Sequence, residues 1–451
     1  MLNVLQTIVE HKRQLIVNTA DVYELKPSER DFKKALSHKQ FAFIMECKKA
    51  SPSKGLINKN FDLTKILPVY EQYADAISVL TEERFFQGSF NNLRYVSEHT
   101  DRPVLCKDFI LEPKQVRLAR YYGADAVLLM LSILNDFEYK ACLQQAKDLN
   151  MDVLTEVHNE EELDRAIALG SEIIGINNRN LKDLTTSLEN TKKLASRIPD
   201  DRIVVTESGI DNHDDVIELA AHADSCLVGS SLMASQDLES AVQKLVYGDI
   251  KICGLTNLQD RELVDLKPAS TLGVIFAESS KRKLKQPIGR SQKPLIGVFQ
   301  NQSVDFVSNA IKEYELNGIQ LHGEESQNYI NQLRASIGEE FFISKVIHAL
   351  NEALNFNYQR INEFLIDSQV EQQQGGTGST FDWNLLATND VQLHKNKLRI
   401  AGGLNASNIQ LLKQMGFSKL DICSGSEKSV GVKCSEKLDQ IFDSAKLIAR
   451  Y

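Results

Sequence analysis

The chain has 451 residues, of which 42% are hydrophobic and 25% charged, and its formal net charge is −9. A chain of this length exceeds a single hydrophobic core, so two or three domains are expected. The acidic balance without a long basic run argues against nucleic acid as a partner, and the longest apolar stretch, residues 126–134, is too short to cross a bilayer.

Cysteine and histidine usage indicates the compartment and argues against a metal enzyme. Seven cysteines are spread along the chain without a CxxC pair, which favours a reducing compartment over a disulfide framework or a structural zinc site. Nine histidines show no HxH or HExxH spacing. The N-terminus carries scattered charges and no small-residue cleavage site, so no signal peptide is expected. We therefore expect a cytoplasmic protein that uses neither a metal ion nor a cofactor.

The first forty residues precede the first predicted strand and carry a helical pattern. Two placements are open for them. They form either a cap under the floor of the domain that follows or an extra wall over the mouth of its site. The sequence does not decide between the two.

Short β-branched apolar runs alternate with helical stretches through the first half of the chain. Segments such as EELDRAIALG carry apolar residues at helical spacing, whereas the runs between them are almost continuously apolar. This alternation is typical of parallel strands that crossover helices bury on both faces. Eight such units in about 250 residues predict a (β/α)₈ TIM barrel. The predicted strands are Phe41–Lys48, Ala76–Thr81, Pro103–Lys107, Ala126–Met130, Asp152–Glu156, Ile173–Asn177, Ile203–Glu207 and Ser225–Gly229.

Polar and charged side chains stand at the predicted C-terminal ends of these strands, where (β/α)₈ barrels carry their chemistry. Glu46 and Lys48 are two residues apart, so on a strand both point to the same side, into the mouth of the barrel. Lysines among carboxylates neutralise them and shift their pKa values. A ring of salt bridges that only closes the barrel is the alternative, although so many buried ions are costly without a function. The residues of this ring are Glu46, Lys48, Glu82, Lys107, Glu156, Asn177, Arg179, Glu207, Ser208, Gly229 and Ser230.

Two glycine-containing turns follow the predicted seventh and eighth strands, where barrels of this class commonly bind phosphate. They read ESGI at 207–210 and VGSSLM at 228–233. Glycine lets backbone amides approach an anion closely, and the N-terminus of a following helix favours negative charge. Either turn alone is also compatible with a ligand-free loop, but the pair in these positions predicts a phosphate site.

A second set of eight apolar runs begins after residue 248, with no Pro- or Ser-rich linker before it. The boundary lies between the helical segment ESAVQKLVYG and the strand IKICG, so we expect domains at 1–248 and 249–451. This set predicts a second TIM barrel fused directly to the first. An open doubly wound sheet is the alternative for either half. The predicted strands are Lys251–Gly254, Leu272–Phe276, Leu295–Phe299, Gly318–His322, Phe342–Val346, Phe364–Asp367, Leu398–Gly402 and Lys419–Cys423.

The second half has fewer charges at its strand ends, and three side chains stand out. Cys253 ends the first predicted strand in KICGLTN, Asp367 ends the sixth in FLIDSQ, and Arg282 lies in the loop after the second. A buried cysteine is usually a small core residue, but a strand-top position with an aspartate across the mouth favours a catalytic role. GGTG at 375–378 and AGGL at 401–404 are glycine clusters suited to phosphate.

The first half resembles indole-3-glycerol-phosphate synthase over its whole length. The motifs that carry the resemblance are ECKKASPSKG at 46–55, LCKDFI at 105–110, TEV at 155–157, GINNRNL at 175–181, TESGI and VGSSLM. The resemblance implies a decarboxylating ring closure that converts 1-(o-carboxyphenylamino)-1-deoxyribulose 5-phosphate to indole-3-glycerol phosphate.

By this resemblance, Lys107 is the general acid at the ketone, and Glu156 is the acid or base in the dehydration. Lys48 holds the substrate carboxylate and shares the proton transfers. A lysine that acts as an acid needs a pKa lowered toward neutrality, which burial and the neighbouring lysine are expected to supply. The other implied residues are Glu46, Asn177 and Glu207 for orientation, Ser51, Arg179, Ser208, Gly209, Gly229 and Ser230 for substrate and phosphate, and Phe86 and Phe109 for the anthranilate ring.

The second half resembles phosphoribosylanthranilate isomerase through KICGLTN, QLHG, AGGL and the run from FLID through GGTG to FDW. The implied reaction is the Amadori rearrangement of N-(5-phosphoribosyl)anthranilate to the aminoketose named above. Asp367 would protonate the ring oxygen, Cys253 would take the C2 proton, and Arg282 would contact the anthranilate carboxylate. The phosphate site implied by the resemblance comprises Gly376, Gly378, Gly403, Ser424 and Gly425.

Two segments depart from the isomerase pattern. A Ser-Gly-Val-Glu-like turn is usual after the last strand, whereas this chain reads CSGSEKS, with Ser426 at the substituted position. QVEQQQ before GGTG is an insertion that we expect to lengthen a mobile lid. Both changes are able to lower isomerase activity without abolishing it.

The product implied for the second barrel is the substrate implied for the first, so the two resemblances support each other. Together they predict a bifunctional, monomeric enzyme of tryptophan biosynthesis whose partners are small phosphosugar–anthranilate substrates. One rival is another pair of phosphosugar barrels, such as a histidine-pathway isomerase, which would need paired aspartates at opposing strand tops. The other rival is a second barrel that only stabilises the first. Nothing in the sequence supports channelling of the intermediate.

Overall fold

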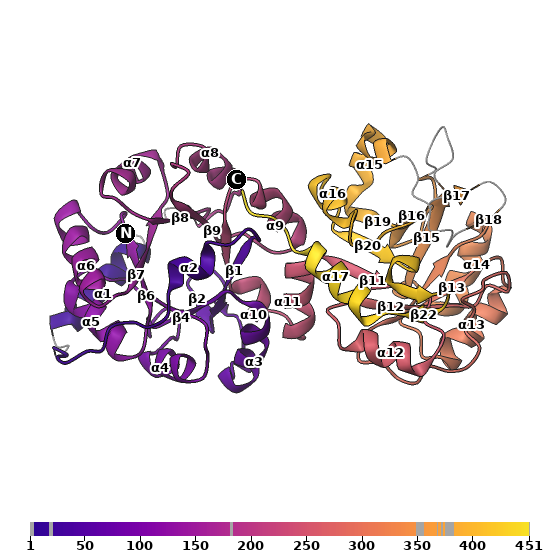
Figure 1. The fold of residues 1–451 in the computed structure, drawn as a ribbon, viewed down its shortest axis with the longest axis horizontal. Helices are drawn as coiled ribbons and strands as arrows, with labels where there is room; N and C mark the ends of the chain where they lie inside the picture. Colours follow the sequence, from indigo (N-terminus) through magenta and orange to yellow (C-terminus); the bar gives the residue numbers. More distant parts are fainter. Residues whose placement is uncertain are drawn as a thin grey trace. The chain divides into compact units, whose positions relative to one another are not determined.

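The computed structural model describes residues 4–17, 21–180, 184–348, 356–367, 369–370, 373–374 and 383–450. Contacts divide the chain into two compact units, Met1–Val242 with Ile448–Tyr451, and Gln243–Leu447. Each unit is built around one closed barrel of parallel strands with helices outside it (Figure 1).

The first barrel closes because β1 pairs in parallel with β10 as well as with β4. Between these two partners the strands follow one another in chain order around the barrel. A short antiparallel pair, β2 (Ala50–Ser51) and β3 (Gly55–Leu56), follows the first strand. The barrel strands are β1 (Ala42–Cys47), β4 (Ala76–Leu80), β5 (Val104–Lys107), β6 (Ala126–Met130), β7 (Asp152–Val157), β8 (Ile173–Asn177), β9 (Ile203–Glu207) and β10 (Ser225–Val228).

Several helices of this barrel begin where a polar side chain accepts the first free backbone amides. Asn135 accepts from the amide of Glu138 at 3.0 Å, and the Glu138 carboxylate accepts from the amide of Asn135 at 2.9 Å. This reciprocal cap fixes where the helix starts after its strand. The helices are α3 (Leu63–Tyr73), α4 (Phe90–Glu98), α5 (Pro113–Tyr121), α6 (Asp136–Asp148), α7 (Glu160–Ala168), α8 (Glu189–Ala195), α9 (His213–Ala220), α10 (Ser230–Met233) and α11 (Leu238–Tyr247).

The N-terminal segment takes both of the placements that the sequence left open. Helix α2 (Phe32–Leu36) packs against β1 and β4, and the amide of Lys33 donates to Asp152 at the start of β7 at 2.8 Å. This helix is therefore a cap under the floor. Helix α1 (Val4–Val17) lies instead at the mouth, where Leu5 and Ile8 line the cavity described below.

The interior of the first barrel is apolar from the floor up to the mouth. Successive side chains of a strand point to opposite faces, so every second residue of each strand contributes to this interior. The next inward position on each strand then falls at the mouth. The buried cluster consists of Phe32, Leu36, Ala42, Ile44, Ala76, Leu105, Ala126, Leu128, Met130, Leu154, Ile173, Ile203, Val205 and Leu227.

The second barrel closes in the same way, because β11 pairs in parallel with both β12 and β20. Its strands are β11 (Asp249–Ile252), β12 (Thr271–Ile275), β13 (Leu295–Phe299), β14 (Gly318–Leu321), β15 (Phe342–His348), β16 (Glu363–Asp367), β19 (Leu398–Ile400) and β20 (Lys419–Ile422). Its α-helices are α12 (Leu258–Asp265), α13 (Val304–Glu313), α14 (Gln327–Ile337), α15 (Asn389–His394), α16 (Ile409–Gln414) and α17 (Ser435–Ala445). A short antiparallel pair, β21 (Glu427–Ser429) and β22 (Val432–Lys433), follows the last barrel strand.

An ion network replaces apolar packing at the floor of the second barrel. Arg399 on β19 donates to Glu363 on β16 and to Asp249 on β11, each at 2.8 Å. Arg399 and Glu363 are buried. Burial alone would raise the pKa of Asp249, but Arg399 holds it well below its usual range. Arg399 and Glu363 therefore stabilise the barrel only together, since either one alone would be a buried charge without its main partner.

The C-terminal residues return to the first unit. Ile448 forms a β-bridge with Gln40, and the amide of Ala449 donates to the carbonyl of Lys39 at 2.9 Å. Arg450 pairs with Asp224 at 3.1 Å. Nothing in the sequence pattern predicts this return, because the segment is too short to show a period of its own.

The predicted strands are confirmed in both halves, and the open doubly wound sheet is excluded because both barrels close. Of the QVEQQQ insertion, β17 (Gln369–Val370) and β18 (Gln373–Gln374) pair as antiparallel strands.

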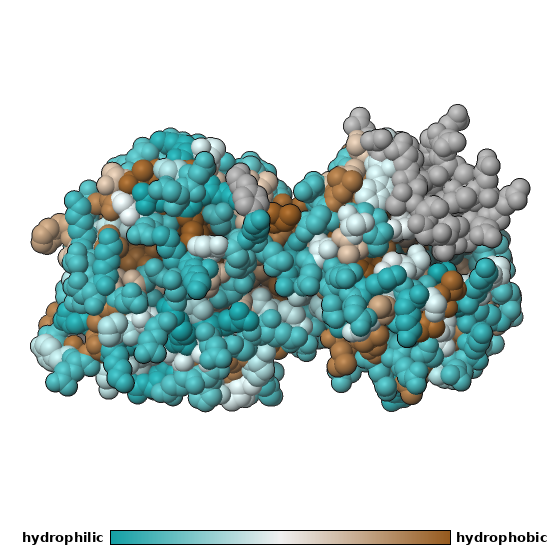
Figure 2. Space-filling model, in the orientation of Figure 1, coloured by the Kyte–Doolittle hydropathy of each residue, from teal (hydrophilic) through white to brown (hydrophobic). Residues whose placement is uncertain are grey.

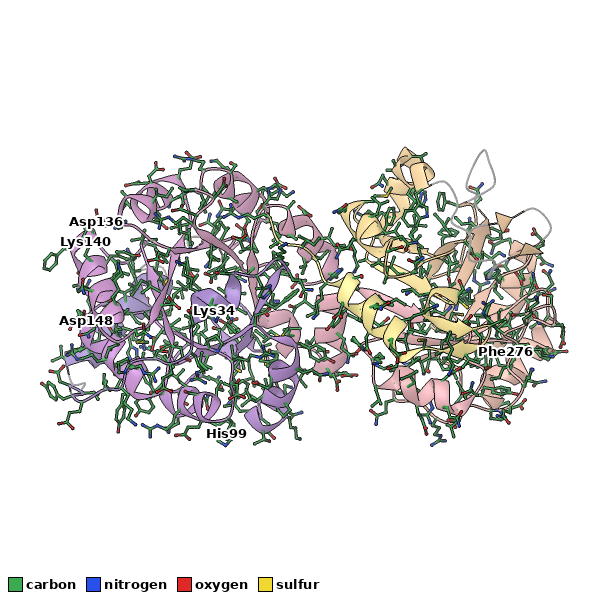
Figure 3. All side chains as sticks on the ribbon, viewed as in Figure 1. Lys34, His99, Asp136, Lys140, Asp148 and Phe276 are labelled. Atoms are coloured by element: carbon green, nitrogen blue, oxygen red, sulfur yellow. The ribbon has the colours of Figure 1, made fainter. Side chains whose placement is uncertain are left out.

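Hydrophilic residues cover most of the face of each unit that Figure 2 shows. Aromatic side chains gather inside instead. Phe276, labelled in Figure 3, stacks on Phe299 with ring centroids 4.9 Å apart. Within the part of the chain that the structure describes, no helix is both long and apolar enough to span a membrane.

We predict that Arg399→Met destabilises the second barrel by about 3–5 kcal/mol, because the buried Glu363 and the partly buried Asp249 lose their main partner. Arg290→Met is the matched control, since Arg290 pairs with Glu315 at 2.6 Å but its side chain is 85% exposed. An exposed pair contributes only about 0–1 kcal/mol. Urea unfolding followed by the fluorescence of Trp383, the single tryptophan, reports on the second barrel. An equal loss of unfolding free energy in Arg399→Met and Arg290→Met would contradict the prediction.

Candidate active sites

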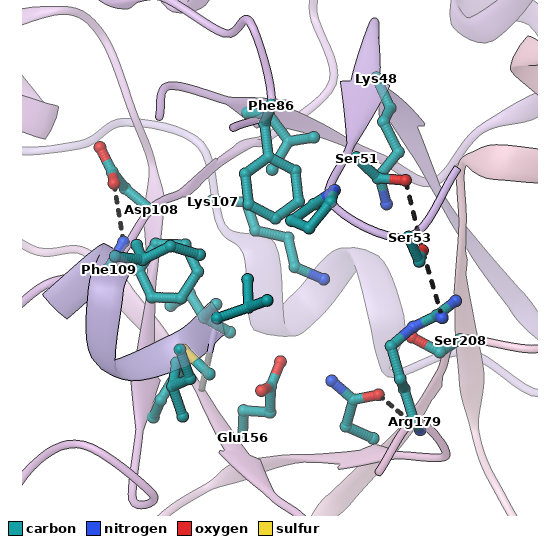
Figure 4. A pocket seen from close by; sticks show the side chains of 18 of the residues that line it. Lys48, Ser51, Ser53, Phe86, Lys107, Asp108, Phe109, Glu156, Arg179 and Ser208 are labelled. Carbon is teal, nitrogen blue, oxygen red and sulfur yellow. Dashed lines mark hydrogen bonds between the residues drawn. The ribbon is translucent and has the colours of Figure 1, made fainter. Parts of the chain in front are cut away.

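A cavity of about 900 Å³, part of it open to solvent, occupies the mouth of the first barrel (Figure 4). Strand ends, helix α1 and the loops after the strands form its wall. Most of the residues that the sequence predicts for this site line it. They are Glu46, Lys48, Ser51, Phe86, Lys107, Phe109, Glu156, Asn177, Arg179, Ser208 and Ser230.

The charged part of the wall follows from strand alternation. On β5, Leu105 belongs to the apolar interior and Lys107, two residues later, lines the cavity. On β7, Leu154 and Glu156 repeat this arrangement. On these two strands the inward-facing residues below the mouth pack the core, and the last inward-facing residue lines the cavity.

Ion pairs cross the mouth of this barrel between strands that are not neighbours. Lys107 Nζ on β5 lies 2.6 Å from a carboxylate oxygen of Glu207 on β9 and 3.7 Å from one of Glu46 on β1. Lys48 Nζ lies 2.9 Å from the other oxygen of Glu46. Because the order of the strands separates β1, β5 and β9, these contacts lie inside the barrel mouth.

The pKa of Lys107 is raised, so the expectation that burial and the neighbouring lysine lower it is wrong. Burial does act downward, but Glu207, Glu46 and Glu156 outweigh it. Burial and the repulsion of the other carboxylates raise the pKa of Glu207 to about 7, although Lys107 opposes the shift. Among the described residues, Oε1 of Glu207 is buried without a hydrogen-bond partner. The carboxyl therefore takes up a proton near neutral pH.

The cavity has an aromatic end and a polar end, with Lys107 between them (Figure 4). Phe86 and Phe109 stand at one end with their ring centroids 6.1 Å apart. Guanidinium and hydroxyl groups gather at the other end, where Arg179 Nη1 is 3.4 Å from Ser53 Oγ. The polar end comprises Ser51, Ser53, Arg179 and Ser208. An elongated ligand with an aromatic group at one end and an anion at the other fits this order.

Gly209 and Gly229 lie at positions where neighbouring side chains leave no room for a Cβ atom. Gly209 has φ +81°, and a Cβ there would lie 2.4 Å from a methyl carbon of Thr186. A Cβ on Gly229 would lie 2.7 Å from Oε1 of Glu46. A side chain at either position would displace its neighbour, so glycine is required for packing whether or not an anion binds.

Glu82 does not belong to the predicted ring. Strand β4 ends at Leu80, and the chain turns before the next inward position is reached. The Glu82 carboxylate instead accepts from the amides of Phe85 at 2.7 Å and Phe86 at 3.1 Å. Its place is therefore under the loop that carries Phe86, one step behind the cavity wall.

Helix α1 supplies residues that sequence reasoning missed. Val4, Leu5 and Ile8 line the cavity. Lys12, one turn further along, is buried and pairs with Asp108 at 2.6 Å at the end of β5. The spacing of Val4, Ile8 and Lys12 on one helical face was the available signal, but a lysine on that face gives no hint of its partner.

A chain of polar contacts crosses the second barrel below its mouth. Lys251 Nζ donates to Asp421 at 2.8 Å and to Gln320 at 2.5 Å. Gln320 Nε2 is 3.1 Å from His322 Nδ1, and His322 Nε2 is 3.3 Å from Asp367 Oδ2. The predicted Asp367 is thus linked to the opposite wall through groups that the sequence did not single out.

Cys253 and Cys423 occupy neighbouring positions at the ends of β11 and β20. Lys433 Nζ donates to the carbonyl of Cys253 at 2.6 Å and to that of Cys423 at 3.2 Å. The interaction between the two thiols lowers the pKa of Cys423 and raises that of Cys253. Coupled thiols share the proton, so the thiolate belongs to the pair. Sequence reasoning missed Cys423, because its partner lies at the other end of the domain.

Arg282 forms a two-point ion pair with Glu427, through Nε and Nη2 at 2.8 Å each. Both residues are buried. Glu427 was not predicted, although it lies in the CSGSEKS turn. The substituted Ser426 fits this turn, since its hydroxyl donates to the carbonyl of Cys423 at 2.7 Å and accepts from Lys433 at 3.0 Å.

Gly403, Ser424 and Gly425 come together in a hollow of about 810 Å³ that opens to solvent. Gly403 has φ +66°, and a Cβ on Gly425 would lie 2.0 Å from a backbone oxygen. Lys437 also lines the hollow and supplies a cation. The other two predicted phosphate residues, Gly376 and Gly378, lie outside the described residues.

Two family models match the chain, one in each half. Residues 2–245 match the model for indole-3-glycerol phosphate synthase, and residues 250–444 match the model for N-(5'phosphoribosyl)anthranilate (PRA) isomerase.

Similar proteins cover nearly the whole chain. The tryptophan biosynthesis protein TrpCF of Vibrio parahaemolyticus is 46% identical over 98% of this chain and 92% of its own length. The protein of that name from Vibrio cholerae is 48% identical over 93% of this chain and 89% of its own length. Among solved structures, a phosphoribosyl anthranilate isomerase from Thermus thermophilus is 25% identical over 44% of this chain and 97% of its own, with a TM-score of 0.38.

We predict that Lys12→Met loosens helix α1 from the mouth, because Asp108 loses its buried cation. Amide exchange over residues 4–17 should rise about tenfold or more, which corresponds to about 1.4 kcal/mol of local stability. Arg13→Met, an exposed neighbour on the same helix, is the control. Hydrogen–deuterium exchange read by mass spectrometry makes the measurement, and unchanged protection in Lys12→Met would show that the pair does not anchor the helix.

Proposed function

The chain belongs to the family of bifunctional proteins that join an indole-3-glycerol phosphate synthase to an N-(5'-phosphoribosyl)anthranilate isomerase, and we propose how its residues carry out the two reactions. It is an enzyme of tryptophan biosynthesis. Its C-terminal barrel isomerises N-(5-phosphoribosyl)anthranilate to 1-(o-carboxyphenylamino)-1-deoxyribulose 5-phosphate, and its N-terminal barrel decarboxylates and cyclises that product to indole-3-glycerol phosphate.

The order of groups along the first cavity is the observation that supports the synthase assignment best. Phe86 and Phe109 would take the anthranilate ring, and the polar end around Arg179 would take the phosphate. The ketone of an elongated substrate then lies between them, near Lys107. The remaining phosphate contacts are assigned to Ser51, Ser208, Gly209, Gly229 and Ser230.

Lys107 is assigned as the general acid of ring closure. When the aromatic carbon attacks the ketone, the ketone oxygen gains negative charge and needs a proton. An alkoxide is a stronger base than an amine, so an ammonium with a raised pKa still protonates it and meanwhile stabilises the charge. Lys48 would hold the substrate carboxylate that leaves as carbon dioxide. Glu156 would serve the dehydration, and Glu46, Asn177 and Glu207 would orient these groups.

Asp367 and Cys253 are assigned to the isomerase. Asp367 would protonate the ring oxygen and open the sugar to a Schiff base. Cys253 would then accept the C2 proton, and the thiolate that it needs is shared with Cys423. Arg282, oriented by Glu427, would contact the anthranilate carboxylate. Gly403, Ser424 and Gly425 would bind phosphate together with Gly376 and Gly378.

We further assign residues 1–248 to the synthase domain and 249–451 to the isomerase domain. The protein would act in the cytoplasm as a monomer, on small phosphosugar–anthranilate substrates. The rival of two other phosphosugar barrels lacks support, because the mouths carry Lys107 with Glu156 and Cys253 with Asp367 rather than pairs of aspartates.

Two single variants test the division of labour. Lys107→Met should lower the synthase rate by about 10²–10⁴-fold and leave the isomerase unchanged, because proton transfer is lost in one barrel only. Cys253→Ala should do the reverse. Cys434→Ala, whose thiol donates to Glu436, is the control for the second barrel.

The assay supplies phosphoribosylanthranilate and follows anthranilate fluorescence and indole absorbance together. Lys107→Met should accumulate the aminoketose, and Cys253→Ala should leave the starting material unconverted. If Cys253→Ala kept full isomerase activity, the second barrel would use another base.

A further inference from the structure

His158, which the assignments above do not use, stands beside the reacting groups of the first barrel. It follows β7 directly, two residues after Glu156. Its Nε2 lies 3.2 Å from Oε1 of Glu156, and its Nδ1 lies 3.1 Å from Oε2 of Glu162 on α7. Exposed fractions are 11% for the His158 side chain and 2% for that of Glu156. The imidazole is thus held between two carboxylates and away from bulk water.

Contacts with α7 and α8 hold the backbone of His158 and the carboxylate of Glu162 in place. The backbone amide of His158 donates to Glu162 at 2.8 Å, and Asn159 Nδ2 donates to the other oxygen of Glu162 at 2.8 Å. From α8, Asn190 Nδ2 donates to the carbonyl of His158 at 3.2 Å. Glu162 is therefore fixed by its own contacts and serves as the rear anchor of the ring.

The charged neighbours of this pair favour the protonated form of His158 and the ionised form of Glu156. Burial would lower the pKa of His158, but Glu156 and Glu162 raise it to about 10. Burial would raise the pKa of Glu156, but His158 lowers it to about 2, with help from Lys107 on β5 and Asn177 on β8. At neutral pH the pair is an imidazolium facing a carboxylate.

The contact between the two groups is electrostatic rather than an aligned hydrogen bond. Oε1 of Glu156 and Nε2 of His158 are both buried, and neither has a hydrogen-bond partner of good geometry within the described chain. Glu156 also lines the cavity, so the carboxylate that His158 holds is within reach of a bound substrate. The pair is thus arranged to keep Glu156 ionised without blocking it.

We propose that His158 is a positioning residue of the synthase, which keeps Glu156 as a carboxylate so that Glu156 is the base of the dehydration step. This rests on the synthase function proposed above and decides between the acid and base roles of Glu156. Glu156 takes a proton from the C1 methylene, and the electrons of that C–H bond form the C1–C2 double bond of the indole. The C2 hydroxyl leaves as water with a proton from the Lys48 ammonium.

Removing the imidazolium should leave burial as the main influence on Glu156. The pKa of Glu156 then rises, and a growing fraction of the enzyme holds the protonated, inactive form as the pH falls. H158Q should therefore move the acidic limb of the synthase kcat profile to higher pH by a unit or more. One pH unit below the midpoint of the shifted limb, H158Q should keep about a tenth of its plateau kcat, while KM stays within about twofold.

The experiment measures synthase pH profiles of the full chain for wild type, H158Q and H158A, with H99Q as control. His99 lies at the C-terminal end of α4, and its Nδ1 contacts the carbonyl of Tyr95. Isomerase activity normalises the amount of protein in each preparation, and an unchanged synthase KM reports that the first barrel is folded. Substrate deuterated at C1 adds a second readout, because slower proton removal should enlarge the isotope effect on kcat in H158Q.

The outcomes separate the inference from the function it rests on. A wild type without synthase activity would overturn the proposed function itself. An unshifted acidic limb in H158Q and H158A, with a synthase KM like that of wild type, would overturn the role of His158. A higher rate at pH 7 in these variants would show that Glu156 works protonated, as an acid. A shifted limb with an enlarged isotope effect supports the proposal.

Discussion

The two-residue repeat of a β-strand, imposed on a closed barrel, decides where the charged side chains at the strand ends of this protein lie. A parallel strand buried on both faces has no solvent side, so its inward residues must fill the barrel in layers from floor to mouth. Leu105 and Leu154 occupy such layers, and the next inward residues, Lys107 and Glu156, reach the mouth. On such a strand, the core residue and the site residue are consecutive inward positions. A shift of the strand register by one residue would therefore turn both of them out of the barrel interior.

The two barrels fill those layers with different chemistry. The first is apolar below the mouth, so its ions are concentrated at the top, where Lys107 meets Glu46 and Glu207. The second carries ions at the floor, through Arg399, and in the middle, through Lys251. Buried ion networks of this kind contribute little net stability compared with apolar packing but penalise any arrangement that separates the partners. The second barrel therefore depends on correct partners from β11, β16, β19 and β20, which lie far apart in the chain.

Strands and the residues at their ends could be predicted from local sequence patterns. Residues whose role depends on a partner far away in the chain could not. The strands were predictable because each is a short apolar run, and Lys107 and Glu156 were predictable because they end such runs. Glu82 was misassigned because alternation holds only while the strand continues, and β4 ends at Leu80. Cys423 and Glu427 were missed because their importance comes from Cys253 and Arg282, which reach them only when β11 and β20 close the barrel. Lys12 was missed for the same reason, since its partner Asp108 follows β5, two strand–helix units further along the chain.

The direction of the Lys107 pKa shift could not be predicted from the residue types of the site alone, because it depends on which charges surround the ammonium. A second lysine nearby suggests a lowered pKa, but the three carboxylates that surround the ammonium decide the result. For the proposed role of Lys107 as the general acid, a raised pKa is more suitable than a lowered one. A neutral lysine at pH 7 could neither attract a substrate that carries a carboxylate and a phosphate nor donate a proton to the developing alkoxide. The proton that the cluster exchanges most readily lies instead on Glu207, whose pKa of about 7 is close to the working pH.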